Sequence, residues 1–385
     1  VYLVLAAGVF LSFLTGDLFN LFVAFEMMLT ASYILITLGG RLDQVRSGMT
    51  YVVINLVAST FFVVLLALLY AALGTVNMAD ISERMHTLPH GMRVAFALLM
   101  FVVFGIKAAV FPLFFWLPDS YPTAPTAVTA IFAGLLTKVG IYCMIRTQTL
   151  LIAKDDRISR FLLVIAGLTM IIGVLGAIAQ NDIKRILSFH IVSQIGYMVL
   201  GLGLFTVAGI AAAIFYALNQ IVLKSTLLLV GGLVDHGAGS SGLTRVGGLA
   251  RRFPILAWLF LLPALSLAGI PPFAGFVAKL GIIRSGLDAG QGLVVAVSLA
   301  VSLLTLFSMS KIWNGAFWGE VELVVEPDDG PTARWGATVP MLGATGVLVA
   351  VSVALAVFAG PLYSLCERAS TALLDPHDYL RTVLP

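Results

Sequence analysis

The chain has 385 residues, of which 60% are hydrophobic and 11% are charged, and its mean hydropathy is +1.05. Soluble domains carry about 25% charged residues, so this chain has too little charge to cover a water-facing surface of its size. The formal net charge of +3 is spread through loops, and no basic tract points to nucleic acid as a partner. Composition therefore excludes an ordinary soluble domain and predicts an integral membrane protein whose surroundings are the lipid bilayer.

Near-continuous apolar runs predict helices that span the roughly 30 Å hydrocarbon core, and not the short alternating strands of a membrane barrel. The first run begins at Val1, with no initiator methionine and no charged leader, which suggests that the chain starts part-way through a longer protein. The predicted fold is an all-α polytopic membrane protein. We expect about eleven transmembrane segments, at residues 1–14, 18–38, 49–74, 93–117, 124–146, 158–179, 183–204, 206–234, 254–286, 290–318 and 337–360.

Two of these segments combine a lysine with helix-breaking prolines. The fourth is broken at Pro112, after Lys107, and the ninth is broken at Pro271 and Pro272, before Lys279. Broken helices at corresponding positions of two halves are typical of transporters built from inverted repeats, because unwound backbone at mid-membrane depth is stable only along a cavity. We therefore predict two inverted five-helix repeats, each with a broken fourth helix, and then a final helix with a short tail. The predicted regions are 1–147, 158–318 and 337–385.

Four lysines lie far from the ends of their apolar runs: Lys107, Lys138, Lys224 and Lys279. Hydrocarbon cannot hydrate an ammonium group, so each must face a bundle interior or a wet cavity, pair with a carboxylate, or lose its proton. A single such lysine is also compatible with a side chain that extends to the interface. Four in one chain favour a function, and we interpret them as a route for protons, with sodium as a second candidate.

Glu26 lies eight residues into its apolar run. The residues at i+4, i+7 and i+11 are Thr30, Tyr33 and Thr37, so the helix carries one polar stripe that should face protein. Lys107 lies about 20 Å along its own helix at 1.5 Å per residue, which makes Glu26 its natural partner. Such a pair would keep Lys107 protonated, and displacement of the carboxylate would favour release of the proton. The alternative is a static ion pair that fastens two helices together.

A second polar stripe occupies the seventh segment, where His190, Ser193, Gln194 and Tyr197 fall at i, i+3, i+4 and i+7. Such a face can hold water and relay protons, with the histidine titrating near neutrality. Hydrogen bonds between packed membrane helices produce the same pattern. The sequence leaves both interpretations open.

The sequence offers no site for soluble-enzyme chemistry. It has no cluster of His, Cys and carboxylate residues with catalytic-metal spacing, no glycine-rich phosphate loop after a strand, and no nucleophile elbow. Its two cysteines, Cys143 and Cys366, lie far apart and predict neither a disulfide framework nor a metal site. We therefore expect no cofactor and no enzymatic activity of the chain itself.

Several stretches of the sequence resemble the antiporter-like membrane subunits, a family shared by multi-subunit Mrp sodium/proton antiporters and respiratory complex I. These stretches are DLFNLFVAFEMMLTASYILI, FGIKAAVFPLFFWLPDSYPTAPTAVTAIFAGLLTKVGIY, QNDIKRILSFHIVSQIGYM and SLAGIPPFAGFVAKL. The resemblance covers essentially the whole chain. It implies a fourteen-helix fold with two inverted five-helix repeats, of which this chain would hold the last eleven helices.

The resemblance also implies roles for individual residues. The family counterpart of Glu26 pairs with the lysine that matches Lys107, the lysine that matches Lys138 links two half-channels, and the one that matches Lys279 serves the second half-channel. Lys224 and His190 match further positions on the same axis. The chain would thus be a proton-translocating exchanger subunit in a bacterial plasma membrane, with the other subunits of its complex, protons and sodium as partners.

Two rival hypotheses remain. A proton-pumping membrane subunit of complex I, or of a membrane-bound hydrogenase, would carry similar buried lysines while its partner chains supply redox energy. The short tail after Gly360 argues against the complex I subunit with a long lateral helix, and Lys279 argues against the one that usually has glutamate there. The other rival is a helical scaffold with no conduction of its own.

Overall fold

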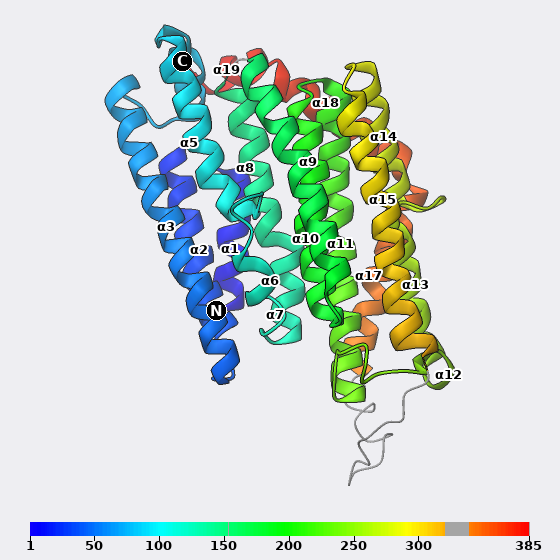
Figure 1. Cartoon of the computed structure of the whole chain (residues 1–385). Helices are drawn as coiled ribbons and strands as arrows, with labels where there is room; N and C mark the ends of the chain where they lie inside the picture. Colours follow the sequence, from blue (N-terminus) through cyan, green and yellow to red (C-terminus); the bar gives the residue numbers. More distant parts are fainter. Residues whose placement is uncertain (153, 320–338, 385) are drawn as a thin grey trace.

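The computed structural model of the chain describes residues 1–152, 154–319 and 339–384. These residues form a bundle of packed α-helices, with no β-strand in the described ranges (Figure 1). Nine helices in this part of the chain are long and apolar enough to cross a membrane. Two shorter apolar helices, Tyr2–Leu14 and Pro254–Ala268, occupy the first and ninth predicted segments. The prediction of an all-α polytopic membrane protein is confirmed, and the count of about eleven corresponds to these nine helices together with the two shorter ones.

The helices of the first half are α1 (Tyr2–Leu14), α2 (Leu18–Ile36), α3 (Leu42–Leu73), α4 (Met78–Arg84), α5 (His90–Ala108), α6 (Trp116–Ser120), α7 (Thr126–Ile131) and α8 (Thr137–Leu150). Those of the second half are α9 (Asp156–Ala179), α10 (Ile183–Gly203), α11 (Val207–Ala238), α12 (Leu249–Arg252), α13 (Pro254–Ala268), α14 (Ala274–Asp288) and α15 (Gly292–Ile312). A π-helical turn, Phe132–Leu136, joins α7 to α8, and a second one, Trp313–Trp318, follows α15.

The C-terminal region comprises α17 (Val339–Val357), α18 (Ala359–Leu374) and α19 (His377–Val383). Residues 337, 338 and 385 of the predicted region 337–385 lie outside the described residues. Helix α18 is too short to be a candidate span, and it packs on α11 and α8 at the end of the bundle where α19 also lies (Figure 1). The stretch that follows the last candidate span is therefore helical in the structure.

The two halves share the same helix caps and helix ends at a constant spacing along the sequence. Asp17 and Asp182 each accept a hydrogen bond from the backbone amide three residues further on, at 2.9 Å, and so cap the N-termini of α2 and α10. Helices α3 and α11 are each 32 residues long and end at Gly74 and Gly239, both with a φ of 74° that favours glycine. In both pairs the second residue lies 165 positions after the first.

Both broken segments are interrupted at their prolines. Helix α5 ends at Ala108, and Pro112 lies in the non-helical stretch before α6. Helix α13 ends at Ala268, and Pro271 and Pro272 lie before α14 begins at Ala274. Proline has no backbone N–H to donate and its ring clashes with the preceding turn, so it disfavours a continuous helix at these positions. The interruptions leave free carbonyl groups inside the bundle.

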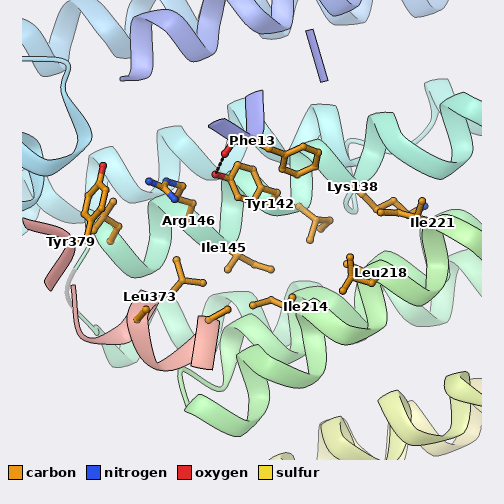
Figure 2. A pocket seen from close by; sticks show the side chains of 15 residues that line it. Phe13, Lys138, Tyr142, Ile145, Arg146, Ile214, Leu218, Ile221, Leu373 and Tyr379 are labelled. Carbon is orange, nitrogen blue, oxygen red and sulfur yellow. Dashed lines mark hydrogen bonds between the residues drawn. The ribbon is translucent and has the colours of Figure 1, made fainter. Parts of the chain in front are cut away.

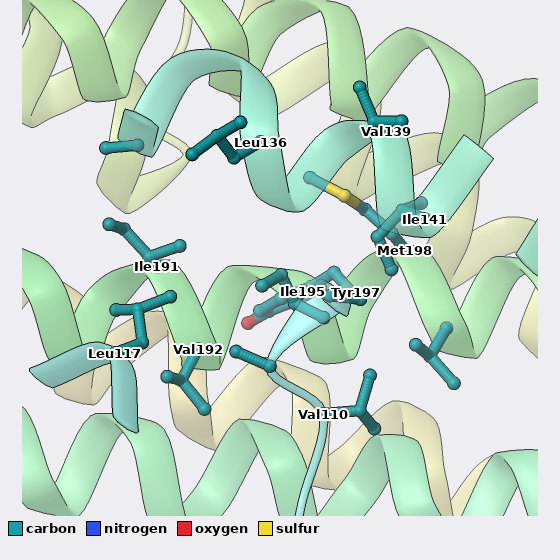
Figure 3. Packing of buried hydrophobic residues seen from close by; sticks show 14 of the residues in the cluster. Val110, Leu117, Leu136, Val139, Ile141, Ile191, Val192, Ile195, Tyr197 and Met198 are labelled. Atoms are coloured by element: carbon teal, nitrogen blue, oxygen red, sulfur yellow. The ribbon is translucent and has the colours of Figure 1, made fainter. Parts of the chain in front are cut away.

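Apolar side chains fill the contact between the halves, where α8 and the broken fourth segment meet α10. Figure 3 shows buried residues from each of these elements facing one another. The labelled residues are Val110, Leu117, Leu136, Val139, Ile141, Ile191, Val192, Ile195, Tyr197 and Met198. Close packing of this kind fixes the first broken segment against α8, which carries Lys138, and against α10.

Close packing of α9 on α10 depends on Gly173, because this position has no room for a side chain. A Cβ built at Gly173 would lie 2.4 Å from the backbone nitrogen of Ser193. We expect Gly173→Ala to force the two helices apart and to lower the free energy of unfolding by about 1–3 kcal/mol, the usual cost of overpacking a core. The midpoint of thermal denaturation in mild detergent measures this effect.

Gly167→Ala is the matched control on the same helix, because the nearest atom to its Cβ would be a Val294 methyl carbon at 4.0 Å. The control should leave the midpoint unchanged or raise it slightly, since alanine favours a helix over glycine. Equal midpoints for the two variants would contradict the close contact between α9 and α10.

Candidate ion pathway

All four lysines predicted to lie at depth are inside the bundle. Their exposed fractions are 5% for Lys107, 3% for Lys138, 0% for Lys224 and 4% for Lys279. They come from α5, α8, α11 and α14, and within the described ranges none has a carboxylate within 4.0 Å. A side chain that extends to the interface would be exposed at its tip, so that alternative does not apply to any of them.

Glu26 and Lys107 bond to two different residues of α3 that lie one helix turn apart. Ser59 Oγ donates a hydrogen bond to Glu26 Oε1 at 2.5 Å. Lys107 Nζ donates to the backbone oxygen and to Oδ1 of Asn55, each at 3.3 Å. Asn55 and Ser59 are four residues apart and therefore share one face of α3. The direct ion pair expected from the sequence is not formed in this structure, although the two charges are close enough to interact electrostatically.

The surroundings of Lys107 suit a cation in two other ways. Its ammonium lies 5.7 Å from the centre of the Phe25 ring, within the range of a cation–π contact. The residue also lies in the last turn of α5, where the helix dipole presents partial negative charge. Lys107 is therefore held by dipoles and π electrons, while Glu26 is bonded to the next turn of α3.

Lys138 and Lys279 are held by backbone carbonyls at places where regular helix is interrupted. Lys138 Nζ donates at 2.5 Å to the carbonyl of Ala133, within the π-helical turn Phe132–Leu136. Lys279 Nζ donates at 3.0 and 3.1 Å to the carbonyls of Leu267 and Ala268, the last residues of α13 before its break. Carbonyls freed from the helical ladder thus serve as ligands for both ammonium groups.

Lys224 differs from the other three, because its Nζ has no hydrogen-bond partner among the described residues. It lies close enough to both Lys138 and Lys279 to interact with them electrostatically. The side-chain amide of Asn219 and the Nδ1 atom of His190 are also buried without a protein partner. Buried polar groups of this kind are typical sites for internal water.

The stripe on α10 is bonded to neighbouring helices, as the packing interpretation expects. His190 Nε2 lies 2.9 Å from Ser308 Oγ on α15. Tyr197 OH donates to the backbone oxygen of Ser298 at 2.6 Å and lies 2.8 Å from Ser302 Oγ. The Tyr197 ring also lies 4.9 Å from Lys279 Nζ, so the stripe extends to one of the buried lysines.

Sequence reasoning missed the neutral residues that contact the charged ones. On α3 these are Asn55 and Ser59, and on α15 they are Ser302 and Ser308. The α15 residues had a detectable sequence signal, since hydroxyl side chains recur there at helical spacing, at positions 298, 302, 305 and 308. No three His, Cys, Asp or Glu side chains in the described part of the chain lie together in a way that could hold a metal ion.

Two cavities lie at opposite ends of the helical stretch Thr126–Leu150. One, of about 500 Å³, runs along α8 from Lys138 past Arg146 to Tyr379, with mainly apolar walls from α8 and α11 (Figure 2). The other, of about 650 Å³, lies beside Thr126 and is lined by ionic side chains that include Asp119, Lys184, Arg185 and Asp235. Each end of this helical stretch therefore has its own recess, and the first of them extends to Lys138.

Comparison with known sequences shows which family the chain belongs to. Residues 15–305 match the family model described as NADH:quinone oxidoreductase/Mrp antiporter, transmembrane. The Na(+)/H(+) antiporter D subunit of Alkalihalophilus pseudofirmus is 46% identical over 385 residues, covering 100% of this chain and 77% of the relative. That of Bacillus subtilis is 38% identical over 382 residues, covering 99% and 76%. The chain thus spans about three quarters of the length of these relatives.

Solved structures agree with the sequence matches. The Mrp complex from Dietzia sp. matches with a TM-score of 0.91 and 36% identity, covering 100% of this chain and 79% of that chain. An archaeal membrane-bound sulfane sulfur reductase gives 0.87 and 27%, covering 100% and 77%. Respiratory complex I from Thermus thermophilus gives 0.75 and 26%, covering 94% and 78%. The resemblance inferred from the sequence is confirmed, and the chain belongs to the NADH:quinone oxidoreductase/Mrp antiporter family of membrane subunits.

Proposed function

We propose that this chain is the proton-translocating subunit of a multi-subunit cation/proton antiporter in a bacterial plasma membrane. The similarity to relatives named as the D subunits of Na(+)/H(+) antiporters supports sodium as the exchanged cation, and the likeness to the Mrp complex supports other subunits as partners. The chain acts as an exchanger and not as a redox enzyme. The observation that carries the proposal is the set of four lysines buried without a carboxylate partner in the described ranges.

The lysines serve as successive proton carriers across the bundle. A lysine held by dipoles inside protein can give up and take back its proton, whereas a lysine at the surface stays charged at neutral pH. The helices pack in an order that passes protons from Lys107 on α5 to Lys138 on α8, then to Lys224 on α11 and Lys279 on α14. His190 interacts electrostatically with Lys224 and Lys279 and takes part in the same proton transfer.

The two halves supply one access route each. We assign the inverted repeats to 1–147 and 158–318, and the closing helix and tail to 337–385. The matched caps and helix ends 165 positions apart, and the matched breaks at Pro112 and Pro272, support these boundaries. The cavities at opposite ends of Thr126–Leu150 are the places where half-channels facing the two sides of the membrane would begin.

Glu26 modulates Lys107 in this mechanism. When the carboxylate approaches, it stabilises the ammonium, and when it moves away the proton is released to the next lysine. We expect Lys107→Ala and Glu26→Ala each to reduce sodium-driven proton exchange at least tenfold while the complex still assembles. Dye fluorescence that reports the pH inside membrane vesicles after a sodium pulse measures this exchange.

Lys154→Ala is the control, because Lys154 is exposed and lies outside the chain of buried lysines. It should exchange at the wild-type rate. Unchanged exchange in the Glu26 and Lys107 variants would remove this pair from the mechanism. Unchanged exchange after replacement of all four buried lysines would support a scaffold without conduction.

Substitution of Lys224 distinguishes a role in transport from a role in stability. Its ammonium is fully buried without a protein partner among the described residues, and methionine has a similar length without the charge. We expect Lys224→Met to abolish exchange and to raise the free energy of unfolding by about 1–3 kcal/mol, because an unpaired buried polar group is removed. Thermal denaturation and vesicle exchange are measured on the same preparation. A variant that loses stability would show that Lys224 is structural.

A membrane subunit of a redox pump is the second candidate, because the match to respiratory complex I covers 94% of this chain at a TM-score of 0.75. The two candidates differ in their partners. We expect the complex purified in mild detergent to contain several membrane subunits and to show no absorbance from iron–sulfur clusters. Stoichiometric iron–sulfur proteins in that preparation would favour the redox pump.

A further inference from the structure

Helix α3 contacts both Glu26 and Lys107, although the contacting side chains carry no charge. Ser59 donates to the Glu26 carboxylate at 2.5 Å, and Asn55 accepts from the Lys107 ammonium at 3.3 Å. Both are buried, with exposed fractions of 8% and 2%. The amide nitrogen of Asn55 is in turn bonded to the carbonyl of Tyr51 at 2.8 Å, which directs the amide oxygen toward Lys107.

The second half places polar groups at the matching positions of α11. The spacing of 165 that relates Gly74 to Gly239 also relates Asn55 to Gln220 and Ser59 to Lys224. Gln220 and Lys224 are both fully buried. The same turn of the same helix therefore faces the ion pathway in each half. In the first half that turn carries a neutral amide and a neutral hydroxyl.

We propose that Asn55 and Ser59 are positioning residues that hold Glu26 and Lys107 apart and compete with their direct contact. Hydrogen bonds to charged groups are about twice as strong as those between neutral groups, so two of them offset much of the attraction that would close the pair. In the separated state Lys107 can lose its proton without first breaking an ion pair. This inference rests on the proposed function, because it concerns the same Glu26 and Lys107.

Few other titratable groups act on this pair. On α2, Tyr33 interacts electrostatically with Glu26. On α3, Tyr51 is bonded to Ser32 and packs against Tyr33. Helix α8, which packs on α5, carries Lys138 and the group Tyr142, Cys143 and Arg146 nearer its other end. Asp119 of α6, which packs on α3, is paired with Arg185 near the surface.

Ser59→Ala and Asn55→Ala test the proposal in vesicles that contain the complete complex. Each variant weakens the separated state, so Glu26 contacts Lys107 more of the time and the ammonium keeps its proton to higher pH. We expect the pH of half-maximal exchange to rise by about one unit in Ser59→Ala, the size expected when one hydrogen bond to a charged group is lost. The rise should be smaller in Asn55→Ala, because this variant also removes an acceptor that stabilises the ammonium and keeps the backbone oxygen of residue 55. Ser59→Thr keeps the hydroxyl and should restore the wild-type profile.

Thr60→Ala is the matched control, because Thr60 is exposed on the same helix and its hydroxyl bonds only to the carbonyl of Leu56. Its pH profile should coincide with that of the wild type. Ser59→Cys, which keeps the volume and is a weaker donor, provides a second variant and should give an intermediate shift. A merely structural role would lower the amount of complex without moving the pH profile.

The outcomes distinguish this inference from the function on which it rests. If Glu26→Ala and Lys107→Ala exchange normally, the proposed function fails. If they lose exchange while Ser59→Ala, Ser59→Cys and Asn55→Ala all keep the wild-type pH profile, the positioning role is wrong and the function stands. A profile that moves to lower pH would also overturn it, because the separated state would then not be the one that releases the proton.

Discussion

An ammonium group inside a membrane protein needs oxygen atoms around it, because neither lipid nor apolar side chains can replace its water. This requirement explains the irregular backbone of the bundle. Lys138 takes its oxygen from a π-helical turn, and Lys279 takes two from the end of α13, where prolines stop the helix. A straight helix would keep those carbonyls in its own hydrogen-bond ladder. The breaks therefore serve as ligand sites, and the apolar packing around them fixes their positions.

Lys107 takes its oxygens from a neighbouring helix instead, one from a backbone carbonyl and one from a side-chain amide. Lys107 lies before its break and takes oxygens from Asn55, while Ser59 satisfies the carboxylate of Glu26. A closed ion pair would hold the proton on Lys107. In the proposed mechanism, hydrogen bonds from neutral groups compete with that ion pair, so the carrier can change state. The second half has a lysine where the first has Ser59, which gives the pathway different chemistry in its two parts.

The elements that follow from local sequence were predictable. Apolar runs and prolines act within a few residues, so the all-α fold, the spans and the interruptions near Pro112 and Pro271 could be expected from sequence alone. The depth of Lys107 and Lys224 followed from their distance to the ends of their runs. The hydrogen-bond partners of these side chains could not be predicted from the sequence, because they depend on how the helices face one another. Two opposite charges at depth suggested direct contact between Glu26 and Lys107, and nothing in the sequence around Ser59 indicated that both would bond to α3 instead.

The central claim is that the four buried ammonium groups lie along one hydrated, protein-lined route. A high-resolution electron cryomicroscopy map of the complete complex in lipid tests it most directly, because it shows both the side chains and the ordered water. The account predicts water molecules within hydrogen-bond distance of Nζ of Lys107, Lys138, Lys224 and Lys279, joined into a continuous file that passes His190. Lysine nitrogens sealed among apolar atoms, or turned outward to the lipid headgroups, would contradict it.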